Sequence, residues 1–365
     1  MSKSYYSLGL MSGTSADGVD ASIIQSDGDT KYEVILDKYF KYNEDIYKSI
    51  HSLKDKINNS KDLKNLSKEI QPIEREITLF HAKVVNAIIK ESKLSINFLG
   101  FHGQTIFHSA KEKISKQLGD GKLLSKLTKK TVIYKFREND LNNKGEGAPL
   151  APIFHKLMKN KYKIKVPLVI LNIGGITNAT YFNTNEEMYS KDIGPGNCMI
   201  DQWIRTNSNK KYDEQGDLAK LGKINKTVLD VALKKFEDIN HFRTYDVKDF
   251  DLSFVDGMSL EDGAATLTEY TLEILNKKLK KICKSSKENI LISGGGRKNI
   301  FLIKKLQEKI NIPLKLIDDF GINGDFVESQ AFAYIAIRSY LNLPISFPET
   351  TGVAAPTTGG IIIKY

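Results

Sequence analysis

The chain has 365 residues, of which 41% are hydrophobic and 27% charged, a composition typical of globular proteins and a length that suits two domains. Two cysteines are too few for a disulfide framework, and we find no signal sequence or membrane-spanning stretch, so we expect a cytoplasmic protein. The net charge of +10 comes from lysines interleaved with apolar positions, as in residues 277–287 and 298–309, which favours solvated helix faces over a nucleic-acid site.

A hairpin is predicted at the start of the chain. Apolar residues alternate with small or polar ones over residues 6–10 and again over 19–23, which is the period of paired strands. The turn between them, residues 11–18, is rich in glycine, serine and threonine. Such a turn lets a ligand approach the backbone closely, and its N–H groups can bind an anion such as phosphate. The alternative is an ordinary solvated hairpin, because the same residue types are common in turns.

The pattern of strand, glycine turn and strand recurs at mid-chain, where Gly174-Gly175 separates two apolar segments. A third glycine cluster, Gly294-Gly295-Gly296, follows a buried strand and either approaches a ligand or makes a tight connection. The repetition predicts two α/β halves, residues 1–162 and 163–365, in which helices cover strands. The last apolar strand, 361–363, could return to the first half.

Polar side chains follow two predicted strands of the first half. His102 and Gln104 come after the strand at 96–100, at the strand end where α/β sheets bind ligands, and their side chains suit a polyol. Neighbours could equally satisfy the histidine. Arg137 follows the strand at 131–134 and could bind a carboxylate in bidentate fashion or form a structural ion pair with Asp140.

A candidate general base lies in the second half. Asp192 is predicted at the end of a strand and is followed by Gly194-Pro195-Gly196-Asn197 and a helical segment. A carboxylate in this position combines a proton acceptor with helix N–H groups that bind anions. The alternative is that Asp192 only ties down the turn.

Taken in order, these motifs resemble the anhydro-N-acetylmuramic acid kinase family. The resemblance covers nearly the whole chain and implies duplicated actin-like, sugar-kinase (ribonuclease H-like) α/β domains that flank a nucleotide cleft. The motifs that carry it are residues 11–15 with 17–20, 102–105, Phe136-Arg137 with Asp140, 147–150, 172–176 with Asn178, Asp192 with 194–197, and 294–297 with Asn299.

The resemblance also implies the chemistry. ATP and Mg²⁺ would be the cofactors, and Asp192 would activate water to attack C1 of the anhydro sugar while O6 takes the γ-phosphoryl group. The products would be N-acetylmuramic acid 6-phosphate and ADP, in cell-wall recycling. The residues implied for the ATP phosphates are Gly13, Thr14, Ser15, Ala16, Asp17, Gly18, Val19, Asp20, Gly174, Gly175, Gly294, Gly295 and Gly296, with Asp17 also on the metal. Those implied for the sugar are His102, Gln104, Arg137, Asp140 and Glu328, with Arg137 facing the lactyl carboxylate.

Two departures concern the sugar site. Lys135 stands where the family usually has aspartate, and Lys144 interrupts a usual glycine pair. An ordinary hexose or amino-sugar kinase, in which Asp192 deprotonates a hydroxyl directly, is one alternative, and a non-catalytic nucleotide-gated binding protein is another. We expect an anhydro sugar and ATP as partners, no nucleic acid and no membrane, and we leave a homodimer open.

Overall fold

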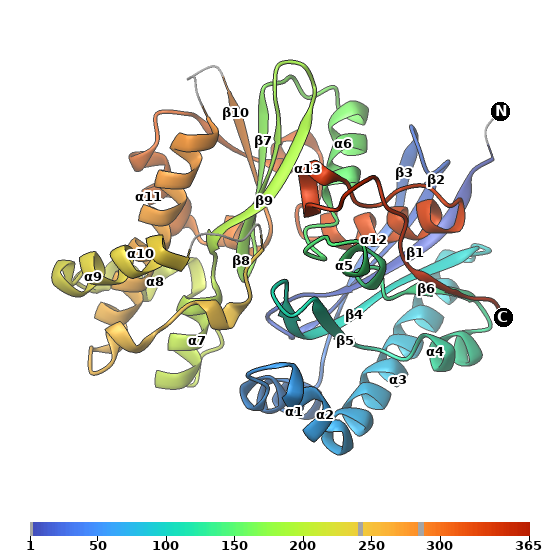
Figure 1. The fold of residues 1–365 in the computed structure, drawn as a ribbon, viewed down its shortest axis with the longest axis horizontal. Coiled ribbons are helices and arrows are strands. Elements are labelled where there is room, and N and C mark those ends of the chain that lie inside the picture. The colour runs from blue at the N-terminus through green and yellow to red at the C-terminus, as the bar shows by residue number, and fades with distance from the viewer. Residues whose placement is uncertain (1–2, 240–243, 284–287) are drawn as a thin grey trace. The chain divides into compact units, whose positions relative to one another are not determined.

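The computed structural model describes residues 3–239, 244–283 and 288–365, which form two compact units (Figure 1). Unit 1 consists of residues 1–164 and 325–365, and unit 2 of residues 165–324. The sequence-based division at 162/163 differs from this at the end of the chain. The last 41 residues belong to unit 1 for two reasons. The helix α12 (Val327–Tyr340) packs on β1 (Tyr5–Ser12), and the last strand pairs within the sheet of unit 1.

Unit 1 is built on a mixed sheet in the order β12-β6-β4-β1-β2-β3, with β5 paired to β4. β1, β2 and β3 form an antiparallel meander, whereas β4 and β6 run parallel to β1. The other strands are β2 (Gly18–Ser26), β3 (Tyr32–Lys41), β4 (Phe98–Ser109), β5 (Ile114–Leu118), β6 (Thr131–Tyr134) and β12 (Ile361–Ile363). The other helices are α1 (Glu44–Lys56), α2 (Ser60–Asn65), α3 (Ser67–Ser92), α4 (Gly121–Thr128), α5 (Glu138–Asn142), α6 (Pro152–Lys161) and α13 (Pro348–Thr351).

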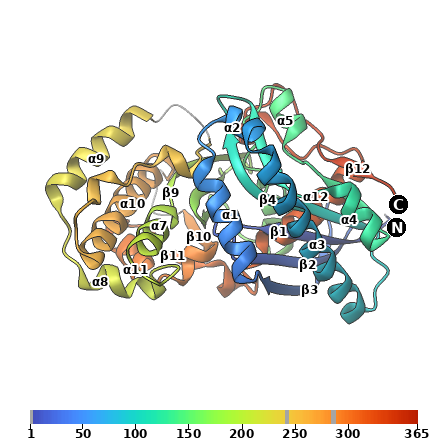
Figure 2. The same cartoon turned by 90° about the horizontal axis from the view of Figure 1, so that it is seen from below.

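Helices cover both faces of this sheet (Figure 2). Leu8 and Leu10 of β1 point into the core shared with α1 and α3. The opposite face carries glycine where α12 approaches: a Cβ on Gly9 would lie 1.9 Å from the Ser329 carbonyl oxygen, and one on Gly100 2.2 Å from that of Phe332. The alternation in the sequence therefore reflects large apolar residues on one face of β1 and small residues on the other. It does not separate a buried face from a solvated one, because β1 is buried on both sides.

Unit 2 repeats the topology of unit 1. Its sheet has the order β11-β10-β7-β8-β9, again an antiparallel meander with two strands added parallel to its first strand. The prediction of duplicated α/β domains is thus confirmed. The strands are β7 (Leu168–Ile173), β8 (Ile176–Phe182), β9 (Met188–Pro195), β10 (Asn289–Ser293) and β11 (Leu314–Leu316). The helices are α7 (Cys198–Asn207), α8 (Asp217–Leu221), α9 (Lys226–Ile239), α10 (Leu260–Ile282) and α11 (Ile300–Lys309).

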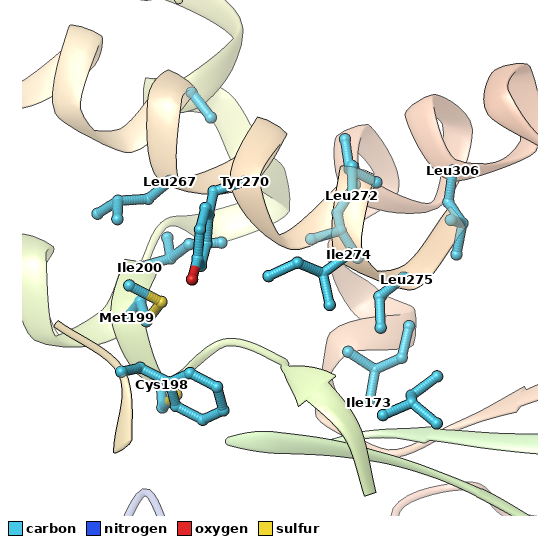
Figure 3. Close-up of a cluster of buried hydrophobic side chains, with 14 of the residues drawn as sticks. Ile173, Cys198, Met199, Ile200, Leu267, Tyr270, Leu272, Ile274, Leu275 and Leu306 are labelled. Atoms are coloured by element: carbon cyan, nitrogen blue, oxygen red, sulfur yellow. The ribbon is translucent and has the colours of Figure 1, made fainter. Parts of the chain in front are cut away.

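The core of unit 2 lies between this sheet and the helices α7, α10 and α11. Tyr270 and Leu275 of α10 pack with Met199 of α7 and Ile173 at the end of β7 (Figure 3). This packing anchors the strand ends from which the glycine turns leave. Among the described residues, no helix has both the length and the hydrophobicity needed to cross a membrane.

Candidate active site

The β1–β2 turn, residues 12–18, is named here the hairpin tip. The antiparallel pairing runs up to Met11 and Asp20, so the tip stands at the end of a fully paired ladder. Within it, Ala16 N–H donates to the Gly13 carbonyl at 3.1 Å, and Ala16 adopts a left-handed φ of 53°. The Thr14, Ser15 and Asp17 side chains are exposed, and Ser15 Oγ donates to Asp17 Oδ1 at 2.7 Å. The predicted hairpin is confirmed.

A β-bulge in β4 sets the direction of His102 and Gln104. The pairing register with β1 shifts between Leu10 and Met11, and Gly103 has a φ of 76°. A Cβ on Gly103 would lie 2.3 Å from the Leu118 carbonyl oxygen, so only glycine fits there. The predicted strand at 96–100 is therefore too short, because β4 continues through the bulge to Ser109. His102 and Gln104 lie inside a strand, not in a loop after it.

His102 and Arg137 form one hydrogen-bonded unit. Arg137 Nη2 and Nε lie 3.0 and 3.3 Å from His102 Nε2, and Arg137 Nη1 donates to the Gly147 carbonyl at 2.7 Å. Since a guanidinium only donates, Nε2 must accept, so His102 is neutral and its Nδ1–H donates to the Gly103 carbonyl at 2.9 Å. Burial, with the Arg137 charge, holds the pKa of His102 well below its usual range.

Asp140 stabilises the loop that ends at Gly147. Its Oδ1 accepts from Gly147 N–H at 2.6 Å and its Oδ2 from the Thr351 hydroxyl at 2.5 Å, and the residue is 1% exposed. Arg137 and Asp140 thus hydrogen-bond to the carbonyl and the N–H, respectively, of the same residue, Gly147. Glu328 lies in the first turn of α12 and is half-buried.

In unit 2 the glycine turns lie at adjacent strand ends. β7 and β10 are parallel neighbours with Asn172 opposite Ser293, so Gly174-Gly175 and residues 294–296 leave the same edge of the sheet. Gly294 has a φ of 80°, and a Cβ there would lie 2.3 Å from Asn172 Oδ1. Gly295 is exposed, and a Cβ added to it would meet nothing within 4 Å, so its backbone is open to a ligand.

An ion pair between the buried Arg297 and the exposed Asp318 fixes the third glycine turn. Arg297 donates through Nε and Nη2 to the two carboxylate oxygens of Asp318 at 2.7 and 3.1 Å, and through Nη1 to the Gly294 carbonyl at 3.1 Å. The contact with Arg297 holds the pKa of Asp318 below its usual value. The guanidinium thereby ties the turn to the segment after β11.

Asp192 lies in the last part of β9, opposite Asn178 of β8. Its side chain is 9% exposed, and its Oδ2 accepts from the Tyr245 N–H at 2.9 Å. Burial, followed by the Asp192 charge, raises the pKa of the Tyr245 hydroxyl to about 12. The carboxylate is therefore buried and oriented by a backbone donor.

The segment after Asp192 is tied to the first glycine turn. Asn197 N–H donates to the Gly174 carbonyl at 2.8 Å, and Gly196 N–H to that of Gly175 at 2.9 Å. A Cβ on Gly196 would lie 2.2 Å from the Gly174 carbonyl oxygen, which explains the glycine there. Asp192 and the Gly174-Gly175 turn thus belong to one hydrogen-bonded structure.

Comparison with known proteins settles the family. The family model described as anhydro-N-acetylmuramic acid kinase matches residues 5–365. An anhydro-N-acetylmuramic acid kinase from Pelagibacter ubique is 52% identical over 373 aligned positions that cover 100% of both chains. The chain belongs to the anhydro-N-acetylmuramic acid kinase family. It is therefore a kinase, a phosphoryl-group transferase, as the ordered motifs predicted.

More distant proteins are also similar. An anhydro-N-acetylmuramic acid kinase from Zymomonas mobilis is 36% identical, over 97% of this chain and 98% of that one. Among solved structures, component A of (R)-2-hydroxyglutaryl-CoA dehydratase from Acidaminococcus fermentans has a TM-score of 0.45 and 12% identity, over 92% of this chain and 99% of that one.

Within this anhydro-N-acetylmuramic acid kinase family member, unit 1 brings together His102, Arg137 and Asp140 through Gly147, and unit 2 brings together the two glycine turns with Asp192. Thr351 was missed by sequence reasoning, because its contact with Asp140 spans 211 positions and has no local signal. Tyr42, which supports the hairpin tip through Ser12, was also missed. The roles of these residues in binding stay predictions.

The carboxylates of the chain fit Mg²⁺ only if phosphate oxygens and waters supply the other ligands of the ion. Within the part of the chain that the structure describes, no three His, Cys, Asp or Glu side chains lie together as a metal site would require. Mg²⁺ in kinases usually takes one or two carboxylates together with phosphate oxygens and waters. Asp17, an exposed carboxylate beside Ser15 on the hairpin tip, suits that arrangement.

Proposed function

We propose that this chain is an ATP-dependent kinase that opens 1,6-anhydro-N-acetylmuramic acid with water and phosphorylates O6. The products are N-acetylmuramic acid 6-phosphate and ADP, which places the enzyme in cell-wall recycling. Family membership over residues 5–365 supports the reaction class. The observation that carries the mechanism is the buried, backbone-oriented carboxylate of Asp192 beside a glycine turn.

The reaction needs an acceptor for a water proton. The water oxygen bonds to C1 and the C1–O6 bond breaks, while O6 bonds to the γ-phosphorus and the bond to ADP breaks. The proton released by the water passes to Asp192. Because O6 is captured by phosphorus as it leaves C1, no free alkoxide has to be stabilised. The Tyr245 N–H orients the carboxylate through Oδ2, and this carboxylate is the proposed proton acceptor.

In unit 1, the nucleotide phosphates would bind to backbone N–H groups of the hairpin tip. In unit 2, residues 174–175 and 294–296 are proposed to bind the nucleotide. Gly295 supports this proposal, since it is exposed and carries no side chain that would block close approach to its backbone. Mg²⁺ bound to the phosphates, contacted by Asp17, would neutralise developing charge. Arg137, held by neutral His102, would face the lactyl carboxylate of the sugar.

Isotope labelling tests the hydrolytic step. In ¹⁸O-water, we expect the product to carry label in its C1 hydroxyl, because that oxygen comes from solvent. Unlabelled product from the anhydro sugar would reject water attack. Faster phosphorylation of intact N-acetylmuramic acid than of its anhydro form would instead favour an ordinary amino-sugar kinase.

A substitution tests the role of Asp192. Asp192→Asn keeps an acceptor for Tyr245 N–H but cannot take a proton, so we expect kcat to fall roughly 10³-fold or more. Asp213→Asn is the matched control: Asp213 is a buried carboxylate of unit 2 that accepts from Leu218 and Ala219 N–H at 2.8 and 3.0 Å. It should lower thermal stability and leave kcat within a few-fold of the wild type. Equal kcat losses in both variants would reduce Asp192 to a structural role.

A further inference from the structure

The carbonyl oxygens of the hairpin tip are held by donors from other segments of unit 1. The Thr14 carbonyl accepts from Lys54 Nζ, and the Ser15 carbonyl from His51 Nε2, each at 3.0 Å. The Asp17 carbonyl accepts from Tyr42 N–H at 2.9 Å and the Tyr39 hydroxyl at 3.0 Å. Carbonyl lone pairs would repel a phosphate, so a tip whose carbonyls are already occupied favours an anion.

Gln104 provides the corresponding contact for Gly13. Its Nε2 donates to the Gly13 carbonyl at 3.0 Å and to the Thr105 carbonyl at 3.3 Å, while its Oε1 lies 2.9 Å from Ser12 Oγ. The amide orientation is fixed, because a backbone carbonyl can only accept. Gln104 is 0% exposed. Both ends of its side chain therefore serve the protein rather than a ligand.

This contact has a geometric consequence for the next peptide unit. The Gly13–Thr14 bond is not among the cis peptides found in the described ranges, and in a trans peptide the C=O and the N–H point in opposite directions. Holding the Gly13 carbonyl toward Gln104 therefore turns the Thr14 N–H away from β4. Thr14 itself is exposed to solvent.

Ser12 connects Gln104 to the rest of the tip. Its hydroxyl lies 2.7 Å from the Gly18 carbonyl oxygen and 3.0 Å from the Tyr42 hydroxyl, in addition to its contact with Gln104. All of these side-chain contacts are buried. The network spans both ends of the tip, and the bulge at His102-Gly103 aims Gln104 into it.

We infer that Gln104 is a positioning residue of the nucleotide site: it fixes the Gly13–Thr14 peptide so that the Thr14 N–H meets a nucleotide phosphate. This inference rests on the proposed function of the hairpin tip and replaces the sugar contact expected from the family resemblance. The affected ligand is the nucleoside triphosphate, and the sugar is affected only through it.

The kinetic test uses Gln104→Met, which keeps length and burial but removes the hydrogen bonds at both ends of the side chain. We expect KM for ATP to rise roughly tenfold while KM for the anhydro sugar stays within about twofold. The matched control is Gln117→Met on β5, where a partly buried glutamine donates to the Thr105 and Ser115 side chains. It should leave both KM values unchanged. A rise in KM for the sugar with KM for ATP unchanged would overturn the inference and return Gln104 to the sugar site, and two unchanged values would also overturn it.

Hydrogen exchange separates this inference from the proposed function. A non-hydrolysable ATP analogue should slow exchange in residues 12–18 of the wild type, and less so in Gln104→Met. Absence of protection in the wild type would reject the tip as a phosphate site. If the analogue protects the wild type, and Gln104→Met shows the same protection and the same KM for ATP, only the role of Gln104 would be rejected. If Gln104→Met fails to fold, Ser12→Ala removes the Ser12–Gln104 contact and should raise KM for ATP by a smaller factor; an unchanged KM for ATP would then count against the network.

Discussion

His81 allows a direct test of how acid destabilises unit 1. It lies on α3 with 0% exposure, its ring 4.9 Å from that of Phe101, and its Nδ1 is 2.8 Å from the Ile77 carbonyl oxygen. That carbonyl only accepts, so Nδ1 carries the proton and the buried Nε2 is unprotonated. Protonating Nε2 would place a charge inside the apolar core, and burial accordingly lowers the pKa of His81 to about 4.

The sign and size of the effect follow from linkage. The folded-state pKa is below the ordinary value of 6.5, so the unfolded chain binds the proton first as pH falls. Stability is therefore fully present above about pH 6.5 and is lost between about 6.5 and 4. At pH 5 the unfolded side chain is almost fully protonated and the folded one is not, so His81 alone costs about 2 kcal/mol relative to pH 8.

The perturbation is His81→Leu, which fills a similar volume and cannot titrate. We expect a change of less than about 1.5 kcal/mol at pH 8, because the substitution nearly conserves volume. Between pH 8 and pH 5 the variant should lose about 2 kcal/mol less than the wild type. It should still lose stability, because burial of ring atoms also lowers the pKa values of His102, His108 and His155.

Urea unfolding read separately for each unit is the assay. Pulsed hydrogen exchange of α3 follows unit 1, whereas fluorescence of Trp203, the only tryptophan, follows unit 2 and serves as an internal control. Parallel pH curves for the wild type and His81→Leu in the α3 signal would refute the reasoning, as would a difference seen only in Trp203 fluorescence.

Two further predictions concern packing and the third glycine turn. Gly100→Ala should lower the free energy of unfolding, measured in urea, by about 3 kcal/mol, since its Cβ would lie 2.2 Å from the Phe332 carbonyl oxygen. Gly295→Ala should keep the melting temperature, because its Cβ would meet nothing within 4 Å. Equal effects of the two substitutions would contradict this account of the glycines. Arg297→Lys should raise the pKa of Asp318 toward its ordinary value, measured by carboxyl NMR, because an ammonium cannot make the two-bond contact with the carboxylate; an unmoved pKa would show that the ion pair does not hold it down.

Local patterns in the sequence were enough to predict several elements of the fold. Alternation predicted the first hairpin, because a strand presents alternate residues to each face, and apolar segments beside glycine turns predicted strands of the second half. The recurrence of strand, glycine turn and strand predicted the duplication, since two domains of the same topology need turns at corresponding positions. The ordered motifs identified the family, which the full-length match confirms.

Long-range packing accounts for the rest. The sequence of α12 indicates a buried helix but not which sheet it covers; that is set by Gly9 and Gly100, which admit its backbone. The environment of Gln104 depends on a bulge, a serine 92 positions away and a tyrosine just after β3, and no local periodicity reports such contacts. Residue types and their order therefore identified the side chains that can bind or catalyse. Packing decided whether each of them contacts a neighbour or is available to a ligand. The reason is that hydrogen bonds form only between groups that folding brings within about 3 Å of each other.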